Sequence, residues 1–369
     1  MRSRRWLVLA VITLQIGLSV WLLGQAVEPP SNSQAASSNA LTVRRYSGTA
    51  QEMATAWGRD EKARFARIYE QVLAANQISA LTEQLLYVSI TRYETYIDAE
   101  SIGEMKAFSQ ACGIRYEQVL LLNCFYDQIS CRQVVAWGAK TKDGRLLHAR
   151  NLDWYDYGDA LRTNNVLLIR QYPTGHATAL LTWPGCFGSL TGCNDQKLSL
   201  AYNLLGGGQQ RFQGEPVFLM LNRVLRQAVS VDQAVGLIQA SQFCTDGSIM
   251  IASARERKAV VVDIQGKQTW VRSDRDVQFI VNDNTCYFDI QGRYKPNKYT
   301  GSPTYRAALA AGPIDVPDLQ RVMANPKVLL SMNLLTAIFD LSQNCVYVAW
   351  GRYEAAHGPY QTFELFAKP

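Results

Sequence analysis

The stretch of sequence that decides the fold covers residues 131–154 and reads CRQVVAWGAKTKDGRLLHARNLDW. Two strand-like runs, Cys131–Ala139 and Arg145–Trp154, lie on either side of the polar sequence Thr-Lys-Asp-Gly at 141–144. Runs of this kind that flank a short polar turn ending in glycine are typical of a β-hairpin. The sequence therefore predicts two antiparallel strands joined by a tight turn.

The pairing of these strands brings reactive side chains together. With the turn centred near Asp143, Cys131 is expected opposite residues near 155. Arg150 and Asp153 then lie on the partner strand within side-chain reach of the thiol. Reaction of a cysteine needs the thiolate, and a permanently charged guanidinium favours that form. A buried structural cysteine beside an ordinary strand-end ion pair would give the same pattern.

Two groups are candidates for taking the proton from Cys131. His148 lies two residues before Arg150, so strand alternation places both side chains on one face. The second candidate is the α-amine of Cys131 itself, which exists only if the chain is cut after Ser130. An α-amine has a pKa of about 8 and can accept a proton near neutral pH. Asp153 would then hold the ammonium form.

The chain begins like an exported protein. Arginines at positions 2, 4 and 5 precede the apolar run Trp6–Leu23, and Gly24-Gln25-Ala26 offers small residues to a signal peptidase. We expect residues 1–26 to be a cleaved signal peptide or, alternatively, an anchor, because the run is close to the length that spans a bilayer. Export would place the protein in the periplasm or outside the cell, and an anchor would add membrane contact.

The rest of the chain divides into three parts. Residues 27–40 are rich in Pro, Ser, Asn and Ala, and a disordered linker is expected over residues 27–45. Residues 46–130 carry apolar residues at helical spacing. Residues 131–369 contain many strand-like runs and two helical stretches, Pro216–Ala228 and Val231–Ala240. Antiparallel strands with separate groups of helices predict an α+β layered fold.

Further strands are predicted after the hairpin. The expected pairs and single strands are Asn165–Gln171 with Ala177–Trp183, Gly188–Thr191 with Lys197–Leu204, Ser248–Ser253 with Ala259–Ile264, and Phe279–Val281, Leu335–Asp340, Val346–Trp350 and Thr362–Phe366. Turn residues separate these runs, as expected for antiparallel neighbours.

Composition and motifs argue against several functions. The net charge of +6 comes partly from the N-terminal arginines, and no basic stripe with interleaved aromatic residues is present, so we expect no nucleic-acid partner. The eight cysteines form no Cys-x-x-Cys pair, and no His-Glu-x-x-His is present. Gly-x-Ser-x-Gly is absent, and Gly206-Gly207-Gly208 lacks the lysine of a phosphate-binding loop. We expect neither a metal nor an organic cofactor.

Several motifs together resemble one enzyme family. The sequence CRQVV at 131–135, Asp143-Gly144 and HARNLDW at 148–154 is similar to the signature of the N-terminal-nucleophile acyltransferases and amidases. The layout resembles the acyl-coenzyme A:6-aminopenicillanic acid acyltransferase family, whose relatives include acid ceramidase, N-acylethanolamine amidase and bile salt hydrolases. That family usually has Thr or Ser after the cysteine and Gly before the arginine, where this chain has Arg132 and Ala149.

The resemblance implies a four-layer αββα fold in which two antiparallel sheets lie between helical layers. It also implies self-cleavage between Ser130 and Cys131 into two chains that stay together. By matching position it implies these roles: Cys131 as the nucleophile, Arg150 and Asp153 as the charged pair beside it, Asn203 as an oxyanion donor, Asn282 as a contact to the α-amine or the oxyanion, and Arg306, with Arg293 as its rival, as a downstream site arginine.

The function expected from these residues is that of a self-processing cysteine amidohydrolase. Such an enzyme would cleave a linear, non-peptide N-acyl amide through an acyl intermediate on Cys131, and its partner would be that small molecule. Transfer of the acyl group to an amine acceptor is an alternative reaction. A catalytically inactive, membrane-tethered binding or scaffold protein is the competing hypothesis, and it predicts a chain that stays intact.

Overall fold

The computed structural model describes residues 41–124, 130–204, 211–273, 277–283, 287–288, 294–295 and 303–367. The chain divides after Ala35 into two units, and all of these residues belong to the second one. The predicted signal or anchor, residues 1–26, lies outside the described residues. Within the described ranges, no helix is long and apolar enough to cross a membrane.

The predicted helical segment contains four α-helices before residue 125. These are α2 (Ala50–Ala75), α3 (Ala80–Ile90), α4 (Ala99–Cys112) and α5 (Tyr116–Cys124), with the short 3-10 helix η1 (Thr91–Thr95) between α3 and α4. Helix α2 begins at a capping box, in which the Thr49 hydroxyl and the Glu52 carboxylate each accept a backbone N–H of the other. Helix α4 ends at Gly113, whose φ of 67° suits glycine.

A strand precedes these helices, and this corrects the predicted linker. Strand β1 (Thr42–Ser47) pairs in parallel with β4 (Val166–Gln171), so the segment expected to be disordered up to residue 45 already belongs to a sheet at Thr42. Arg45 fixes the strand further, since its guanidinium donates hydrogen bonds to the carbonyls of Glu364 and Leu365 at 2.6 and 2.7 Å. Backbone pairing with a distant strand therefore orders a segment whose composition is typical of a linker.

The predicted hairpin is present as β2 (Ser130–Gly138) and β3 (Gly144–Asp153). Its register differs from the prediction, because Cys131 lies opposite Leu152 and not near 155. The loop is five residues long, from 139 to 143, and is bounded by Gly138 and Gly144 with φ of 60° and 74°. Two glycines in the left-handed region close a wider turn than expected, which moves its centre from Asp143 to Thr141.

The strands form two main sheets. The eight-stranded sheet has the order β1-β4-β5-β6-β7-β8-β9-β10, and all its neighbours are antiparallel except β1 and β4. The strands not yet given are β5 (Thr178–Thr182), β6 (Thr191–Asn194), β7 (Leu198–Leu204), β8 (Gly247–Ser253), β9 (Lys258–Gln265) and β10 (Gln268–Ser273). Strand β10 was not predicted. The predicted pairs are present, but the strand expected at Gly188–Thr191 lies at Thr191–Asn194 as β6.

The six-stranded sheet has the order β11-β2-β3-β14-β15-β16 and carries the hairpin. Its remaining members are β11 (Phe279–Asn282), β14 (Asn333–Asp340), β15 (Cys345–Trp350) and β16 (Gln361–Glu364), and a separate two-stranded pair is formed by β12 (Tyr287–Phe288) and β13 (Tyr294–Lys295). The short 3-10 helix η2 (Ala355–His357) connects β15 to β16.

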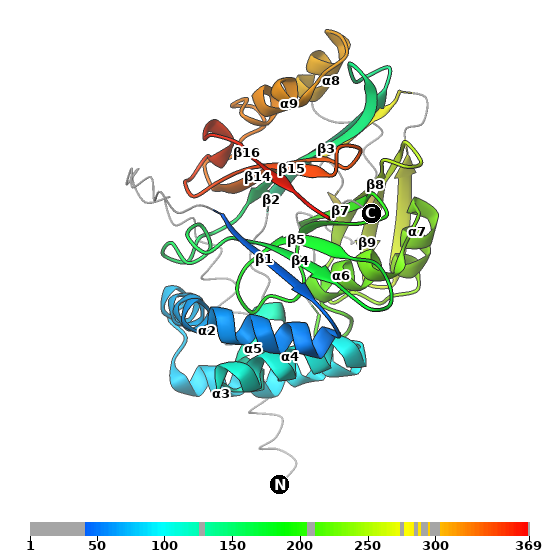
Figure 1. The fold of residues 1–369 in the computed structure, drawn as a ribbon. Coiled ribbons are helices and arrows are strands. Elements are labelled where there is room, and N and C mark those ends of the chain that lie inside the picture. Colours follow the sequence, from blue (N-terminus) through cyan, green and yellow to red (C-terminus); the bar gives the residue numbers. More distant parts are fainter. Residues whose placement is uncertain are drawn as a thin grey trace. The chain divides into compact units, whose positions relative to one another are not determined.

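The two sheets face each other between helical layers (Figure 1). Apolar side chains of the hairpin, such as Val135, pack against Met250 and Val261 of the eight-stranded sheet. On its other face the hairpin contributes Val134 to a cluster with Leu319 of α9 (Val316–Met323), and α8 (Pro303–Ala310) joins the same cluster. Helices α6 (Val217–Gln227) and α7 (Val231–Gln239) cover the outer face of the eight-stranded sheet. The chain therefore has the four-layer αββα fold.

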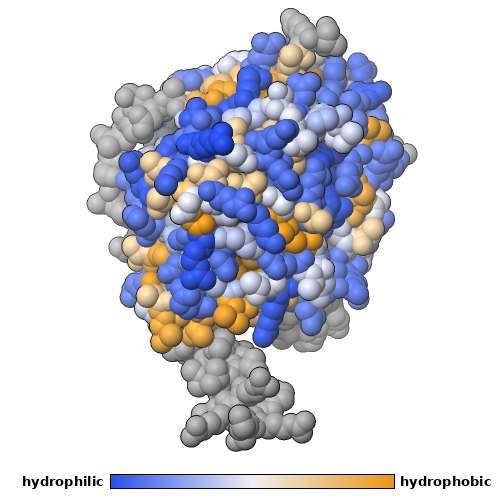
Figure 2. All heavy atoms as spheres, turned by 60° about the horizontal axis from the view of Figure 1, so that its bottom comes forward, coloured by the Kyte–Doolittle hydropathy of each residue, from blue (hydrophilic) through white to orange (hydrophobic). Residues whose placement is uncertain are grey.

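The surface and the cysteines complete the description. Figure 2 shows a face on which hydrophilic residues dominate and smaller apolar areas lie between them. Seven cysteines lie in the described part of the chain, and all seven are free and buried: Cys112, Cys124, Cys131, Cys186, Cys193, Cys244 and Cys345.

Candidate active site

The nucleophile candidate, Cys131, contacts a guanidinium between the two sheets. Arg150 lies opposite Gln133, which is two positions after Cys131 on β2. The side chains of Arg150 and Cys131 therefore lie on the same face of the sheet. Both side chains are fully buried, and Arg150 Nη2 donates to Cys131 Sγ at 2.6 Å. The same guanidinium donates to the carbonyls of Leu190 and Tyr202 at 3.1 and 3.2 Å, and to the Thr191 hydroxyl. Strands β6 and β7 thus hold Arg150 in place.

Opposing influences act on the thiol of Cys131. Burial raises its pKa, and the charge of Asp153 acts in the same direction. The charge of Arg150 lowers the pKa, and so does the backbone amide of Asp153. Burial is the largest of these effects, so the resting thiol of the uncut chain is protonated.

Asp153 approaches the nucleophile from the other face of β3. Alternation along the strand places it with Asn151, which donates to the carbonyl of Met323 in α9, and not with Arg150. Arg150 and Asp153, which the sequence predicted within side-chain reach of the thiol, therefore approach Cys131 from opposite faces of β3. Asp153 is paired across the hairpin with Ser130.

The carboxylate of Asp153 is fully buried and only partly satisfied. Asn333 Nδ2 donates to its Oδ1 at 3.1 Å, whereas Oδ2 has no hydrogen-bond partner within the described part of the chain. Burial raises the pKa of Asp153 to about 7, although Asn333 and the charges of Arg132 and Arg150 oppose the rise. A buried carboxylate oxygen without a donor is ready to receive a new one.

The two predicted asparagines lie beside the main chain of the nucleophile. Asn203 of β7 donates through Nδ2 to the carbonyls of Cys131 and Asn282, at 3.2 and 2.8 Å. Asn282 of β11 accepts from the Ser248 hydroxyl at 3.0 Å through Oδ1. Its Nδ2 is buried and has no hydrogen-bond partner among the residues that the structure describes. An unsatisfied buried N–H donor near a nucleophile is a candidate for stabilising an oxyanion.

Arg306, the predicted downstream arginine, lies on α8 and is partly buried. Its rival, Arg293, lies outside the described residues.

His148 does not act on the thiol in this structure. It lies on the same face as Arg150, as strand alternation predicted, but its Nδ1 is 2.9 Å from Ser199 Oγ and its Nε2 is 3.3 Å from Gln133 Oε1. Burial, aided by the charge of Arg150, lowers the pKa of His148 to about 3. A histidine with this pKa and no contact with Sγ is a poor general base near neutral pH.

Three supporting residues were missed by the sequence analysis. Gln133 stands two positions after Cys131, so period-two alternation was a usable signal for its place between the sheets. Thr191, which accepts from Arg150, and Asn333, which donates to Asp153, come from distant strands with no motif around them. Their positions follow from sheet order and from the register shift between Asn333 and Leu335.

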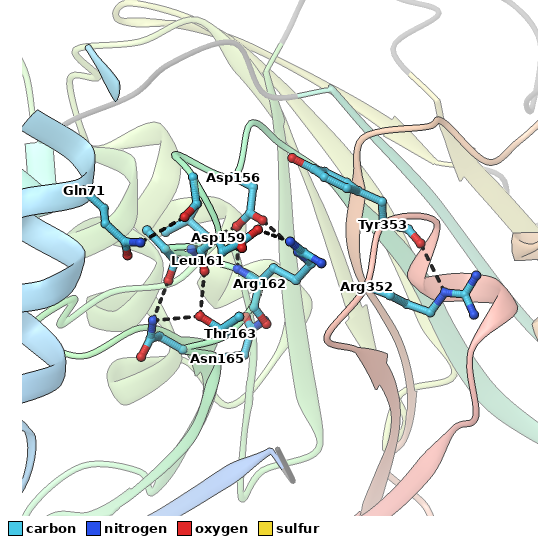
Figure 3. Close-up of polar contacts among 12 residues, drawn as sticks. Gln71, Asp156, Asp159, Leu161, Arg162, Thr163, Asn165, Arg352 and Tyr353 are labelled. Atoms are coloured by element: carbon cyan, nitrogen blue, oxygen red, sulfur yellow. Dashed lines mark hydrogen bonds and ion pairs between the residues drawn. The ribbon is translucent and has the colours of Figure 1, made fainter. Parts of the chain in front are cut away.

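Several hydrogen bonds hold the loop that follows Asp153 (Figure 3). Asp156 accepts hydrogen bonds from the backbone N–H groups of Leu161 and Arg162 at 3.0 and 2.6 Å, and from Arg162 Nε at 2.9 Å. The guanidinium of Arg162 lies 5.2 Å from the ring centroid of Tyr353, and Gln71 of α2 donates to the carbonyl of Gly158 at 2.9 Å. These contacts connect the loop to α2 and to the segment around Tyr353.

Other features of the structure lie apart from Cys131. A surface cavity of about 810 Å³ runs along α8 and α9, where Ala307, Ala311 and Val322 line it together with Asp318 and Arg321. None of the candidate catalytic residues borders this cavity. Within the described ranges, no group of three or more His, Cys, Asp and Glu side chains is arranged to hold a metal ion.

Comparison with known proteins gives distant similarities. No model of a known protein family matches the chain. Protein dcd1A of Dictyostelium discoideum is 25% identical over 295 residues, which are 73% of this chain and 64% of dcd1A. The chain therefore spans less than two thirds of the length of that relative.

Three solved structures are similar to the chain. They are a Caenorhabditis elegans ortholog of N-acylethanolamine-hydrolyzing acid amidase (19% identity, TM-score 0.43, 57% of this chain and 92% of that one), a mutant conjugated bile acid hydrolase from Clostridium perfringens (13%, 0.44, 63% and 92%) and penicillin V acylase from Agrobacterium tumefaciens (14%, 0.43, 60% and 83%). The αββα arrangement that the family resemblance implied is present in this chain's own sheets and helices.

Proposed function

We propose that the protein is a self-processing cysteine amidohydrolase of the N-terminal-nucleophile type, which hydrolyses a linear N-acyl amide through an acyl intermediate on Cys131. The observation that carries this proposal is the 2.6 Å contact between Arg150 Nη2 and Cys131 Sγ at the start of β2. A guanidinium that donates to a buried sulfur stabilises the thiolate, the form that attacks a carbonyl.

The first step of the proposed reaction is self-cleavage. The Cys131 thiol attacks the carbonyl carbon of Ser130 and gives its proton to the peptide nitrogen, which leaves as the free α-amine of Cys131 while the acyl group moves to sulfur. Water then hydrolyses the thioester, which releases the Ser130 carboxylate and regenerates the Cys131 thiol. Asp153 supports this step because it pairs with Ser130 and has a buried Oδ2 without a donor. The new ammonium group would supply the missing hydrogen bond.

The mature enzyme would use the same groups on its substrate. The α-amine takes the thiol proton, the thiolate attacks the amide carbonyl, and the proton passes to the leaving amine. Asn282 Nδ2, which has no hydrogen-bond partner among the described residues, would stabilise the oxyanion, and Asn203 would do so by exchanging its bond to the Cys131 carbonyl for one to the oxyanion. One such donor typically lowers the barrier by about 2.7–4 kcal/mol. Water then hydrolyses the acyl thioester, and an amine acceptor in place of water would give acyl transfer.

The remaining expectations belong to the same proposal. The exported, periplasmic or extracellular location and the optional membrane contact rest on residues 1–26 alone. The small chain is proposed to stay with the large one after cleavage. Asn123 of α5 supports this, since it donates to the carbonyl of Gly185 and accepts from the N–H of Phe187, both at 2.8 Å.

The test is to purify the full chain and its Cys131→Ala variant, and to measure intact mass, the N-terminal sequence and hydrolysis of fluorogenic N-acyl aminocoumarin amides of several acyl lengths. We expect a chain that begins at Cys131 in the parent, and neither cleavage nor hydrolysis in the variant, because a methyl group cannot attack a carbonyl. Cys345→Ala, which removes another buried thiol, is the matched control and should behave like the parent.

Each other outcome argues against part of the proposal. A folded chain that hydrolyses the amides while uncut would exclude the α-amine as the base. A parent that is neither cut nor active would support the scaffold hypothesis. Hydrolysis that persists in Cys131→Ala would refute the assignment of the nucleophile.

A further inference from the structure

A continuous row of buried polar side chains runs away from Cys131 between the two sheets. It consists of Asn203 and Ser199 on β7, Gln133 on β2 and His148 on β3, and none of the four has any exposed surface. The proposed mechanism uses only the first of these residues. Burying polar side chains costs free energy, so a row of four of them needs an explanation other than apolar packing.

The hydrogen bonds of this row have only one consistent direction. Asn203 contacts the backbone carbonyls of Cys131 and Asn282, and a carbonyl can only accept, so the group that faces them must be the NH₂. Its Oδ1 therefore faces Gln133, which must donate through Nε2. The amide of Gln133 is oriented by the same logic, and its Oε1 points to His148.

The direction continues to the end of the row. Since Gln133 Oε1 accepts, His148 must carry its proton on Nε2, at 3.3 Å. His148 Nδ1 is then free of a proton and accepts from the Ser199 hydroxyl at 2.9 Å. Burial lowers the pKa of His148 to about 3, so the ring remains in this neutral form at ordinary pH.

The row thus holds one of two possible orientations of Asn203. A carboxamide is nearly symmetrical in shape, and packing alone does not distinguish its oxygen from its nitrogen. Rotation by half a turn would place Oδ1 of Asn203 against two carbonyl oxygens and its NH₂ against the NH₂ of Gln133. The first contact is repulsive in itself, and the second becomes repulsive because His148 fixes Gln133, so the row adds to the preference that the carbonyls set.

We propose that Gln133 and His148 are positioning residues, which fix the Asn203 carboxamide with its NH₂ group toward Cys131. The inference rests on the proposed function, because it gives Asn203 the role of an oxyanion donor. Neither residue touches the reacting atoms, and both act through Asn203.

The kinetic test uses the processed full-length enzyme and a fluorogenic N-acyl aminocoumarin amide. Gln133→Met keeps the length of the side chain but cannot donate to Asn203, and we expect kcat to fall at least about tenfold with little change in KM, since losing an oxyanion donor outright costs roughly 10²–10³-fold. Gln133→Glu keeps the shape and can only accept, so it should lower kcat as much or more. Asn222→Leu, which replaces another buried carboxamide, should leave kcat unchanged.

A double-mutant cycle separates positioning from general damage. If Gln133 acts through Asn203, Gln133→Met should cause no further loss of kcat in an Asn203→Ala background. Losses that multiply, or a change confined to KM, would overturn the proposal.

A second readout does not depend on turnover. The chain has only three histidines, so the tautomer of His148 can be assigned by nitrogen-15 NMR in the uncut Cys131→Ala protein. We expect the proton on Nε2, and we expect Gln133→Met to change the signal of His148 alone. A proton on Nδ1 would contradict the proposed directions of the hydrogen bonds in the row, even if the enzyme is active. An inactive parent with the expected tautomer would instead refute the proposed function and leave the hydrogen-bond row standing.

Discussion

Cys131 is held between two charges that act on its thiol with opposite signs. Arg150 lies on the face between the sheets and lowers the pKa of Cys131, whereas Asp153 lies on the other face and raises it. The two residues come from one strand, three positions apart, and alternation separates their side chains. A substitution at each position should therefore move the reactivity of the thiol in opposite directions.

This gives a signed prediction for the processed enzyme. In Arg150→Met the pH at which iodoacetamide alkylates half of Cys131 should rise, and in Asp153→Asn it should fall, each by about one pH unit. Turnover should drop in both variants, since Asp153 also orients the amine. Asp340→Asn, at another buried carboxylate, is the control and should leave the profile unchanged. Shifts of equal sign in the two test variants would contradict the arrangement.

At this scale the sequence predicted part of the site. The hairpin pattern placed Arg150 near Cys131 because both lie within one local element. It did not give the register, because the loop is wider than expected, so Cys131 lies opposite Leu152 and not near residue 155. Gln133 and Thr191 act on groups of the opposite sheet, and their contacts depend on how the two sheets pack.

Among the elements, α4 and β4 are joined by a buried ion pair. Arg170 Nη1 lies 3.2 Å from Glu104 Oε1, and neither side chain is appreciably exposed. Burial raises the pKa of Glu104 to about 7, although Arg170 and Arg226 oppose this. Glu104 belongs to the proposed small chain and Arg170 to the large one.

Two consequences for stability follow from this ion pair, to be measured by urea unfolding of the uncut Cys131→Ala protein. Adding Glu104→Ala leaves the buried Arg170 without its partner and should lower the free energy of unfolding by about 3–5 kcal/mol. Because the folded pKa of Glu104 is above its ordinary value, its contribution to the free energy of unfolding is largest below about pH 4.5 and is lost as the pH rises to about 7.

Glu104→Gln tests how much of the pH dependence of the free energy of unfolding comes from Glu104. It keeps the shape of the side chain and removes the titration, so the decline between pH 4.5 and 7 should become smaller by roughly 3 kcal/mol. Asp153 contributes a decline of the same sign, so part of the slope should persist. An unchanged slope in Glu104→Gln would assign the whole pH dependence to other groups.

The elements themselves were mostly predictable. Helices α2, α4 and α6 and the antiparallel pairs could be located because their signals are local, with periodic apolar residues, caps and turns. Strand β1 could not, because its partner β4 begins more than a hundred residues later and no turn joins the two strands locally.

For the whole molecule, the proposed cleavage should not separate the two chains. Strand β1 completes the edge of the eight-stranded sheet, Arg45 binds carbonyls near the C-terminal end, and Glu104 pairs with Arg170. We therefore expect two bands on a denaturing gel but one peak in size-exclusion chromatography, with separation only in denaturant. Two native peaks would contradict this prediction, and the uncut Cys131→Ala protein marks the expected elution volume.

The layered fold was predictable from the resemblance and the strand pattern, but the surroundings of Cys131 were not. The thiol is completely buried because the two sheets pack together around the start of β2. The local sequence around residue 131 does not predict how the sheets pack.

The seven buried free cysteines affect how the protein would behave in an oxidising compartment. Burial raises the pKa of every one of these thiols, Cys131 included, so little thiolate is present and none of it is exposed to an oxidant or a disulfide. The native state needs no cross-links and resists sulfenic acid formation, whereas the unfolded chain presents all of these thiols at once. If the proposed export is right, the chain must fold before its thiols are oxidised, because burial in the folded core is what protects these thiols from mispairing.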